Sequence, residues 1–131
     1  MLGTQQALKD RTKEFALRVI RLVRALPRSV DGRAIGNQLI RSGTSVAANY
    51  RAACRARSRA EFAAKIGIVV EEADETCLWI ELIMESDLLP HVRCESLLAE
   101  ASELVAIMIA TQKTLVNSTR KNPKSEIRNS K

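Results

Sequence analysis

The stretch from Ser58 to Leu89 constrains the fold more than any other part of the chain. Its apolar residues recur at steps of three and four, which is the spacing of one face of an α-helix. Ser58 stands three residues before Glu61, a pattern typical of a capping box at the start of a helix. The stretch therefore predicts one long helix with a core face made of Phe62, Ile66, Val69, Ala73, Cys77, Ile80 and Met84.

A second line of residues follows the same spacing on another side of this helix. It lies a quarter turn or more away from the core face, so the helix needs partners on two faces. The line consists of Ile68, Glu72, Glu75, Trp79 and Leu82.

Three further amphipathic helices are expected around this one. The first runs from about Asp10 to Leu26 after a frayed start and ends before Pro27, whose ring cannot continue a helix. The second runs from an N-cap at Asp31 to about Ala56, and the fourth runs from Pro90 to about Val116.

Four such helices with short connections favour an all-α, antiparallel, up-down-up-down four-helix bundle. We expect the bundle to occupy residues 1–117 and a disordered basic tail to occupy residues 118–131, because the tail is polar and has no periodicity. Gly36 and Gly43 interrupt the second helix, where each costs roughly 1 kcal/mol against alanine. Their presence indicates a close approach by a neighbouring helix or a kink at Gly43.

Charge is unevenly distributed along the chain. Residues 1–65 hold fourteen Lys or Arg and four Asp or Glu, whereas residues 66–103 hold one basic and ten acidic residues. A bundle with a basic half and an acidic half binds polyanions, pairs with another copy of itself, or simply stays soluble. The candidate nucleic-acid-binding residues form a stripe on the first two helices, made of Arg21, Arg24, Arg28, Arg33, Arg51 and Arg55.

A polar seam is expected between the second and third helices. Buried polar groups must be paired, so such a seam fixes helix register, and we favour this structural role over a ligand site. Arg41 is expected within ion-pair reach of Glu72 or Glu75. The whole seam consists of Arg41, Ser42, Ser45, Asn49, Glu72, Glu75 and Trp79.

The third helix also offers apolar residues for self-association. These residues are Ile68, Leu78, Trp79 and Leu82, and the alternative is that the first two helices cover them within one chain.

Catalysis, metal binding and membrane insertion find little support in the sequence. The single histidine, His91, lies in a turn without an orienting partner, and three widely spaced cysteines form no metal or redox motif. The acidic residues around Glu72 lack the Glu-x-x-His pairs of di-iron bundles. We expect no enzyme activity, no cofactor, no small-molecule substrate and no membrane span, and a cytoplasmic protein with reduced thiols.

Three segments resemble a known bacterial family. They are GNQLIRSGTSVAANYRAA at residues 36–53, SRAEF at 58–62 and EADETCLW at 72–79. Together they are similar to the four-helix bundle proteins known as 23S rRNA intervening-sequence proteins, over about residues 10–116. The resemblance implies an antiparallel bundle assembled as a homopentamer. It also implies distant kinship to the accessory protein of diversity-generating retroelements, a basic pentamer that binds nucleic acid and a reverse transcriptase.

The resulting hypothesis is a non-enzymatic, oligomeric bundle that binds RNA or DNA through its basic surface. The alternative is a scaffold for protein–protein interaction, including a retroelement accessory role with a reverse transcriptase.

Overall fold

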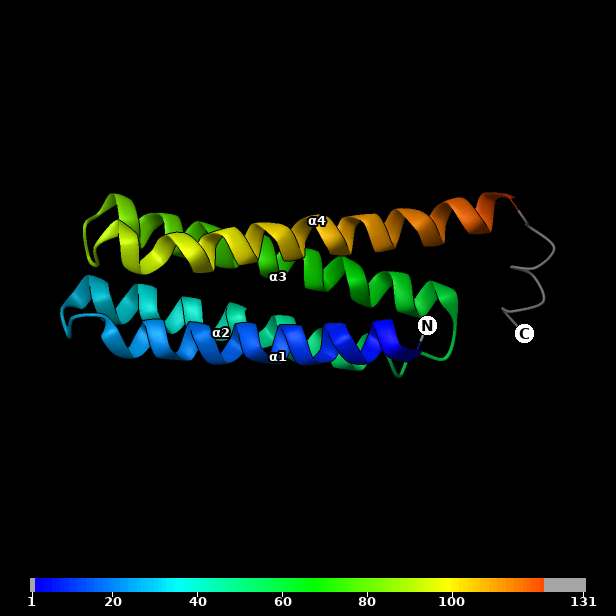
Figure 1. Cartoon of the computed structure of the whole chain (residues 1–131), viewed down its shortest axis with the longest axis horizontal. Helices are drawn as coiled ribbons and strands as arrows, with labels where there is room; N and C mark the ends of the chain where they lie inside the picture. Colours follow the sequence, from blue (N-terminus) through cyan, green and yellow to red (C-terminus); the bar gives the residue numbers. More distant parts are fainter. Residues whose placement is uncertain (1, 122–131) are drawn as a thin grey trace.

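The chain forms four long helices that run back and forth as an antiparallel bundle (Figure 1). The computed structural model describes the backbone of residues 2–121 and the side chains of residues 3–115. All regular elements within residues 2–121 are helical, which confirms the expected fold class. The helices are α1 (Leu2–Ala25), α2 (Val30–Ala53), α3 (Arg59–Glu85) and α4 (His91–Lys121).

Helix α1 begins earlier than its periodicity indicates. It starts at Leu2, so the expected frayed start before Asp10 is wrong. Leu8 packs against the core, and the buried hydroxyl of Thr12 donates to the Leu8 carbonyl at 2.8 Å. These local contacts hold the first turns in place. The helix ends at Ala25, two residues before Pro27.

Helix α2 is capped by Ser29, not by Asp31 as expected. Ser29 has an extended backbone, and its hydroxyl accepts a hydrogen bond from the Gly32 amide at 3.1 Å. Asp31 lies two residues after Ser29, in the first turn of the helix, and its carboxylate accepts from the same amide at 3.0 Å. The helix ends at Ala53, so Arg55 lies in the following turn and not on the helix.

The glycines of α2 allow α1 to approach closely. A Cβ atom on Gly43 would lie 2.7 Å from both methyl carbons of Val19, which is closer than real contacts allow. A Cβ on Gly36 would lie 3.2 Å from a methyl carbon of Leu26. The close approach expected from the sequence is therefore present, and it occurs along the contact between α1 and α2.

Helix α3 starts as the sequence predicts. The Ser58 hydroxyl accepts from the Glu61 amide at 3.1 Å, although the Glu61 carboxylate reaches the Arg57 amide instead of closing the box on Ser58. The helix ends at Glu85, and Asp87 then adopts the left-handed region with φ 59°. This turn redirects the chain into α4.

Helix α4 continues through Lys121, past the expected boundary of the bundle at residue 117. The rest of the predicted tail, residues 122–131, lies outside the described residues.

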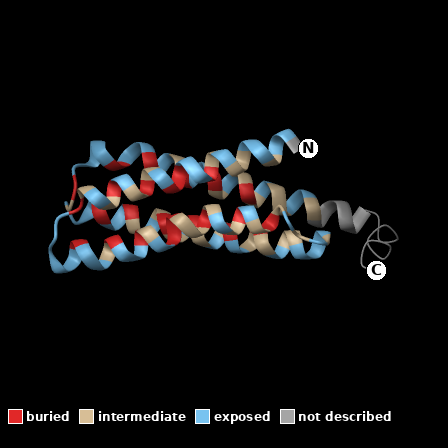
Figure 2. Cartoon of the chain, turned by 90° about the horizontal axis from the view of Figure 1, so that it is seen from below, coloured by how far each residue is buried: buried red, intermediate tan, exposed pale blue. Residues whose placement is uncertain are grey.

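Buried residues follow the inner stripes of all four helices, as Figure 2 shows. Helices α2 and α3 pack extensively on each other, as do α3 and α4, and α1 packs against α2. The contact between α1 and α4 is the thinnest of the four. On this side of the bundle, polar side chains bond across from α1 to α4.

Candidate nucleic-acid interface

The predicted polar seam brings Arg41 against two carboxylates of α3. Its guanidinium forms an ion pair with Glu75 and lies 3.7 Å from a carboxylate oxygen of Glu72. The predicted ion-pair reach of Arg41 is confirmed, but its side chain is 52% exposed, so the pair is not buried as expected. Because water screens a pair of this kind, its contribution to stability is modest.

Three other predicted seam residues, Trp79, Asn49 and Ser45, form hydrogen bonds within their own helices. The Trp79 indole donates to the Glu75 carboxylate at 3.3 Å. On α2, the Asn49 amide donates to the Ser45 hydroxyl at 2.8 Å and to the Ser45 carbonyl at 2.9 Å. Among the described side chains, Asn49 and Ser45 thus bond to each other within α2 and form no hydrogen bond to α3.

A residue that the sequence analysis missed provides the buried link between α2 and α3. The Thr76 hydroxyl donates to the Ser42 hydroxyl at 2.9 Å, and both residues have no exposed surface. The position of Thr76 could have indicated this role, since it falls between Ala73 and Ile80 on the core face of α3. One carboxylate oxygen of Glu72 is also buried, and it has no hydrogen-bond partner among the described side chains.

The six predicted arginines are all exposed, but they form two groups and not one stripe. Arg33 and Arg51 are eighteen residues apart on α2, which corresponds to about 27 Å along the axis. Arg28 lies in the α1–α2 connection and Arg55 lies in the α2–α3 connection, at opposite ends of the bundle (Figure 1). We call the first group, Arg21, Arg24, Arg28 and Arg33, the α1–α2 arginine cluster.

Few acidic residues neutralise these arginines. Arg21 lies 3.3 Å from the Glu14 carboxylate, and both side chains are more than half exposed. Among the described side chains, the other five arginines form no ion pair. The carboxylates that pair with arginine elsewhere lie on α3 and α4, facing Arg41 and Arg11.

Arg11 closes the thin side of the bundle. Its guanidinium donates to both carboxylate oxygens of Glu100 at 2.8 Å and lies 3.1 Å from Glu103. The hydrogen bonds from Arg11 lower the pKa of the Glu100 carboxyl below its usual value. The same bonds raise the pKa of Arg11, so the pair stays charged across the neutral range.

Two basic residues absent from the predicted stripe lie close to its Arg21 end. Arg18 on α1 and Arg93 on α4 line a pocket together with Arg21. Arg93 is the single basic residue within the acidic segment 66–103, which is the signal that could have marked it. The basic surface therefore extends from α1 and α2 onto the start of α4.

The apolar candidates for self-association are only partly covered within one chain. Ile68, Leu78 and Leu82 are 38–47% exposed, whereas Trp79 is half-buried against the core. We call Ile68, Leu78 and Leu82 the α3 apolar face.

The structure also shows the surroundings of His91 and bears on whether the chain could bind a metal ion or cross a membrane. The exposed His91 ring lies 3.0 Å from the Met84 carbonyl, at the turn into α4. Within the part of the chain that the structure describes, no group of three His, Cys, Asp or Glu side chains is arranged to hold a metal ion. None of the described helices is long and apolar enough to cross a membrane.

The fold and these surfaces define a class of small all-α four-helix bundle proteins with exposed arginines at both ends of the bundle. Residues 5–110 match the model of the 23S rRNA-intervening sequence protein family, and the chain belongs to this family.

A solved structure supports the same assignment. The chain resembles a Bacteroides thetaiotaomicron protein of unknown function from the S23 ribosomal protein family, with a TM-score of 0.75 and 35% sequence identity. The match covers 80% of this chain and 97% of that one. The comparison with curated proteins found no match.

Proposed function

We propose that the protein is a non-enzymatic, oligomeric bundle that binds RNA or other nucleic acid through the α1–α2 arginine cluster. One observation carries the proposal: the arginines at this end are exposed, and most of them have no acidic partner among the described side chains. Arginines in this state attract phosphate groups, and binding releases the counterions condensed on the nucleic acid. The membership in a family named after an insertion in 23S rRNA supports the choice of RNA as the probe.

The expected binding is tolerant of sequence. Phosphate contacts carry no sequence information, and the chain has too few aromatic residues for stacking on bases, at 3% of its composition. A non-enzymatic role is supported by the single histidine, whose ring bonds to a backbone carbonyl and not to a neighbouring nucleophile.

The test is RNA binding measured by fluorescence anisotropy at several salt concentrations. The variant R24Q/R28Q/R33Q removes three charges from the cluster, and K13Q/K65Q/K113Q removes three charges elsewhere as a matched control. We expect the cluster variant to bind RNA more weakly. Each phosphate contact contributes about 0.7–0.9 to the slope of log affinity against log salt, so the loss of three contacts should lower the magnitude of this slope by roughly 2. The control is expected to stay close to the parent.

Two results would contradict this function. One is the absence of RNA binding by the parent at low salt, and the other is an equal loss in the cluster variant and the control. Circular dichroism spectra of all three proteins check that the helices are intact.

The α3 apolar face favours a second role as a scaffold, with the retroelement accessory function as one form of it. Clustered apolar side chains on a charged surface mark sites of protein association. We expect the face to contact a further copy of the chain, so that L78Q/L82Q lowers the mass measured by light scattering. Leu17, which is 40% exposed on α1, provides the control variant L17Q. A parent with the mass of one chain would rule out the oligomer.

A further inference from the structure

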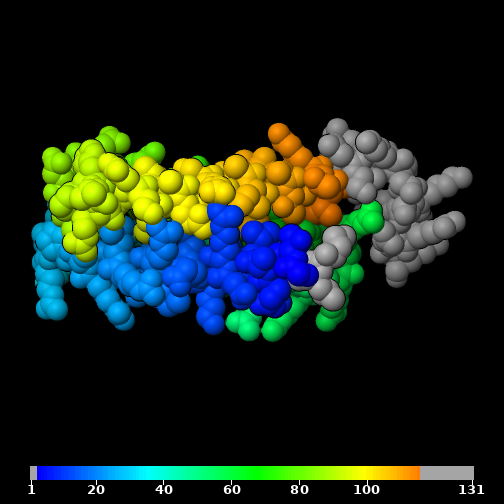
Figure 3. Space-filling view, viewed as in Figure 1, coloured from blue at the N-terminus to red at the C-terminus, as the bar shows by residue number. Residues whose placement is uncertain are grey.

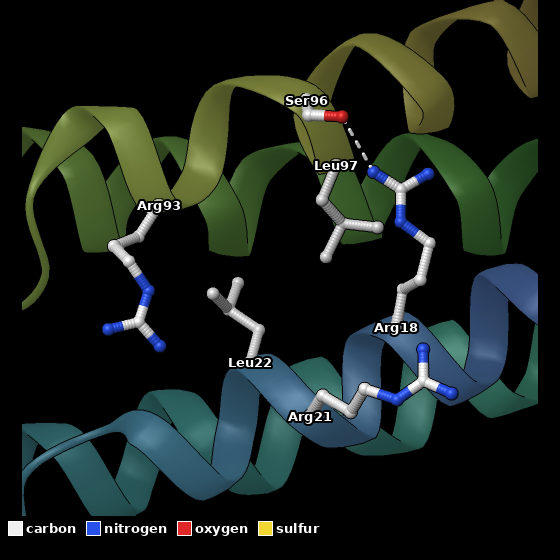
Figure 4. Close-up of a pocket in the computed structure, with 6 residues that line it drawn as sticks. All are labelled: Arg18, Arg21, Leu22, Arg93, Ser96 and Leu97. Carbon is white, nitrogen blue, oxygen red and sulfur yellow. Dashed lines mark hydrogen bonds between the residues drawn. The ribbon is translucent and has the colours of Figure 1, made fainter.

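The pocket between α1 and α4 combines three arginines with an apolar floor. Arg18 and Arg21 come from α1, Arg93 comes from the first turn of α4, and the cavity has a volume of about 300 Å³. Figure 4 shows Arg18 reaching up from α1 and Arg93 reaching down from α4, with Leu22 and Leu97 between them. Space-filling atoms of α1 and the start of α4 face each other along this side of the molecule (Figure 3).

Arg18 is held in position by a hydrogen bond and forms no salt bridge among the described side chains. Its guanidinium donates to the Ser96 hydroxyl at 2.8 Å, which fixes the side chain across the gap between the helices. A hydroxyl is a neutral partner, so the positive charge of Arg18 remains available to an anion. The nearby carboxylate of Glu100 is already bonded through both oxygens to Arg11.

The other two arginines add charge to the same cavity. Arg93 is exposed, and among the described side chains it forms no ion pair. Arg21 contacts Glu14 only through a solvent-exposed pair, which contributes little. Six of the described residues line the cavity, and none of them is acidic. An anion in the cavity is therefore attracted by the arginines and is not repelled by any lining carboxylate.

The chemistry of the lining suits a phosphate group. Guanidinium groups donate paired hydrogen bonds that match the oxygen atoms of a phosphate, and a hydroxyl group adds a further donor or acceptor. The positive end of the α4 dipole lies near Arg93 and acts in the same direction. Leu22 and Leu97 lie between Arg18 and Arg93, so part of the wall around a bound anion is apolar.

We propose that Arg18, Arg93 and Ser96, together with Arg21, form a pocket for one phosphate group of a bound nucleic acid strand. This inference rests on the proposed function and adds a defined anchoring point to it. Arg21 belongs both to the pocket and to the α1–α2 arginine cluster, so a strand anchored here continues along α1 toward Arg24 and Arg28. The phosphate comes either from the backbone of the strand or from its 5′ end.

The test compares the full-length parent with R18Q/R93Q and with K13Q/K113Q, which removes one charge from each of the same two helices. Anisotropy is measured with two RNA oligonucleotides of equal sequence, one with a 5′-hydroxyl and one with a 5′-phosphate. We expect R18Q/R93Q to weaken binding by about tenfold or more and the control to weaken it by about threefold or less. A loss shared by both oligonucleotides indicates a backbone phosphate, and a loss confined to the 5′-phosphorylated one indicates a terminal phosphate.

Two further variants separate the pocket from bulk charge. R18K/R93K keeps both charges but loses the paired donors, and we expect it to bind more weakly than the parent. S96A removes only an exposed hydroxyl, so it preserves the fold and is expected to reduce affinity by about twofold to fivefold.

The outcomes distinguish this proposal from the proposed function. If the parent binds RNA and R18Q/R93Q loses no more affinity than the control, the pocket is wrong and the basic surface as a whole remains the binding site. If the parent binds neither oligonucleotide, both proposals are wrong.

Discussion

Thr76 on α3 and Ser42 on α2 are joined by a buried hydrogen bond of 2.9 Å between their hydroxyl groups. Ser42 also bonds to the Leu39 carbonyl at 3.3 Å, and Thr76 also lies 2.8 Å from the Glu72 carbonyl. Ser42 thus donates to its own helix, and the single hydroxyl hydrogen of Thr76 is shared between Ser42 and the Glu72 carbonyl. A polar pair enclosed by apolar residues favours one register of α2 on α3, because a shifted register leaves the groups unpaired.

Thr76→Val is expected to lower the free energy of unfolding by about 1 kcal/mol, since it keeps the shape of the side chain and removes the donor to Ser42. Denaturant unfolding followed by circular dichroism measures the change. Thr114 bonds to the Ala110 carbonyl but is exposed on α4, so Thr114→Val is the control and is expected to change stability little. Equal effects of the two variants would show that the link between the helices contributes nothing.

Gly43→Ala is expected to destabilise the bundle despite the better helix propensity of alanine. The added Cβ would lie 2.7 Å from the Val19 methyl carbons, and overpacking of this kind costs about 1–3 kcal/mol. Alanine is more favourable than glycine in a helix by roughly 1 kcal/mol. This gain is smaller than most of the overpacking cost, so the net effect is a loss of stability.

Gly67→Ala provides the control in α3, because its Cβ meets only the flexible end of Gln112 at 3.0 Å. We expect thermal unfolding to show a lower melting temperature for Gly43→Ala and an unchanged or higher one for Gly67→Ala. A melting temperature for Gly43→Ala above that of the parent would contradict the close packing of α1 on α2.

The half-exposed ion pair of Arg41 predicts coupling with Glu72. Arg41→Gln leaves two carboxylates of α3 without their cation, and we expect a loss of roughly 1 kcal/mol, which is below the cost of breaking a buried pair. Glu72→Gln is expected to be less harmful in the Arg41→Gln background than in the parent. A double-mutant cycle measures the difference, which should exceed about 0.5 kcal/mol. Additive effects would mean that the two groups do not interact.

The Arg11–Glu100 pair predicts a loss of stability in acid. The pKa of Glu100 is lowered in the folded protein, mainly by its hydrogen bonds with Arg11. The contribution of ionised Glu100 to folding stability is therefore fully present above the pKa that a glutamate has in the unfolded chain, about 4.3. This stability is lost as the pH falls through the lower pKa of Glu100 in the folded protein. Glu100→Gln should lower the melting temperature at pH 7 by about 3–5 °C, and the difference from the parent should shrink toward pH 3.

Glu103→Gln serves as the control for this pair, because Glu103 is 62% exposed and contacts only one nitrogen of Arg11. We expect its effect to be smaller at every pH. A constant difference between Glu100→Gln and the parent from pH 7 to pH 3 would be inconsistent with the lowered pKa.

The helices and most of their core faces follow from the sequence alone. Apolar spacing of three and four residues, the cap at Ser58 and the break at Pro27 are local features, and each acts within one or two helical turns. The core faces are accordingly buried largely as predicted, and the antiparallel order follows from the short connections. Local signals fail at the ends, where Ser29 caps α2 in place of Asp31 and where α1 begins at Leu2.

The position of one helix relative to another was decided only by the tertiary structure. Sequence spacing places Arg33 and Arg51 on one side of α2, but their separation along the axis and the turn around Arg55 divide the basic residues into two groups. In the same way, Thr76 bonds to Ser42, and Arg93 lines the same pocket as Arg18, although these residues are far apart in the sequence. These contacts depend on register and crossing between helices, which result from packing of whole side-chain surfaces and not from any local pattern.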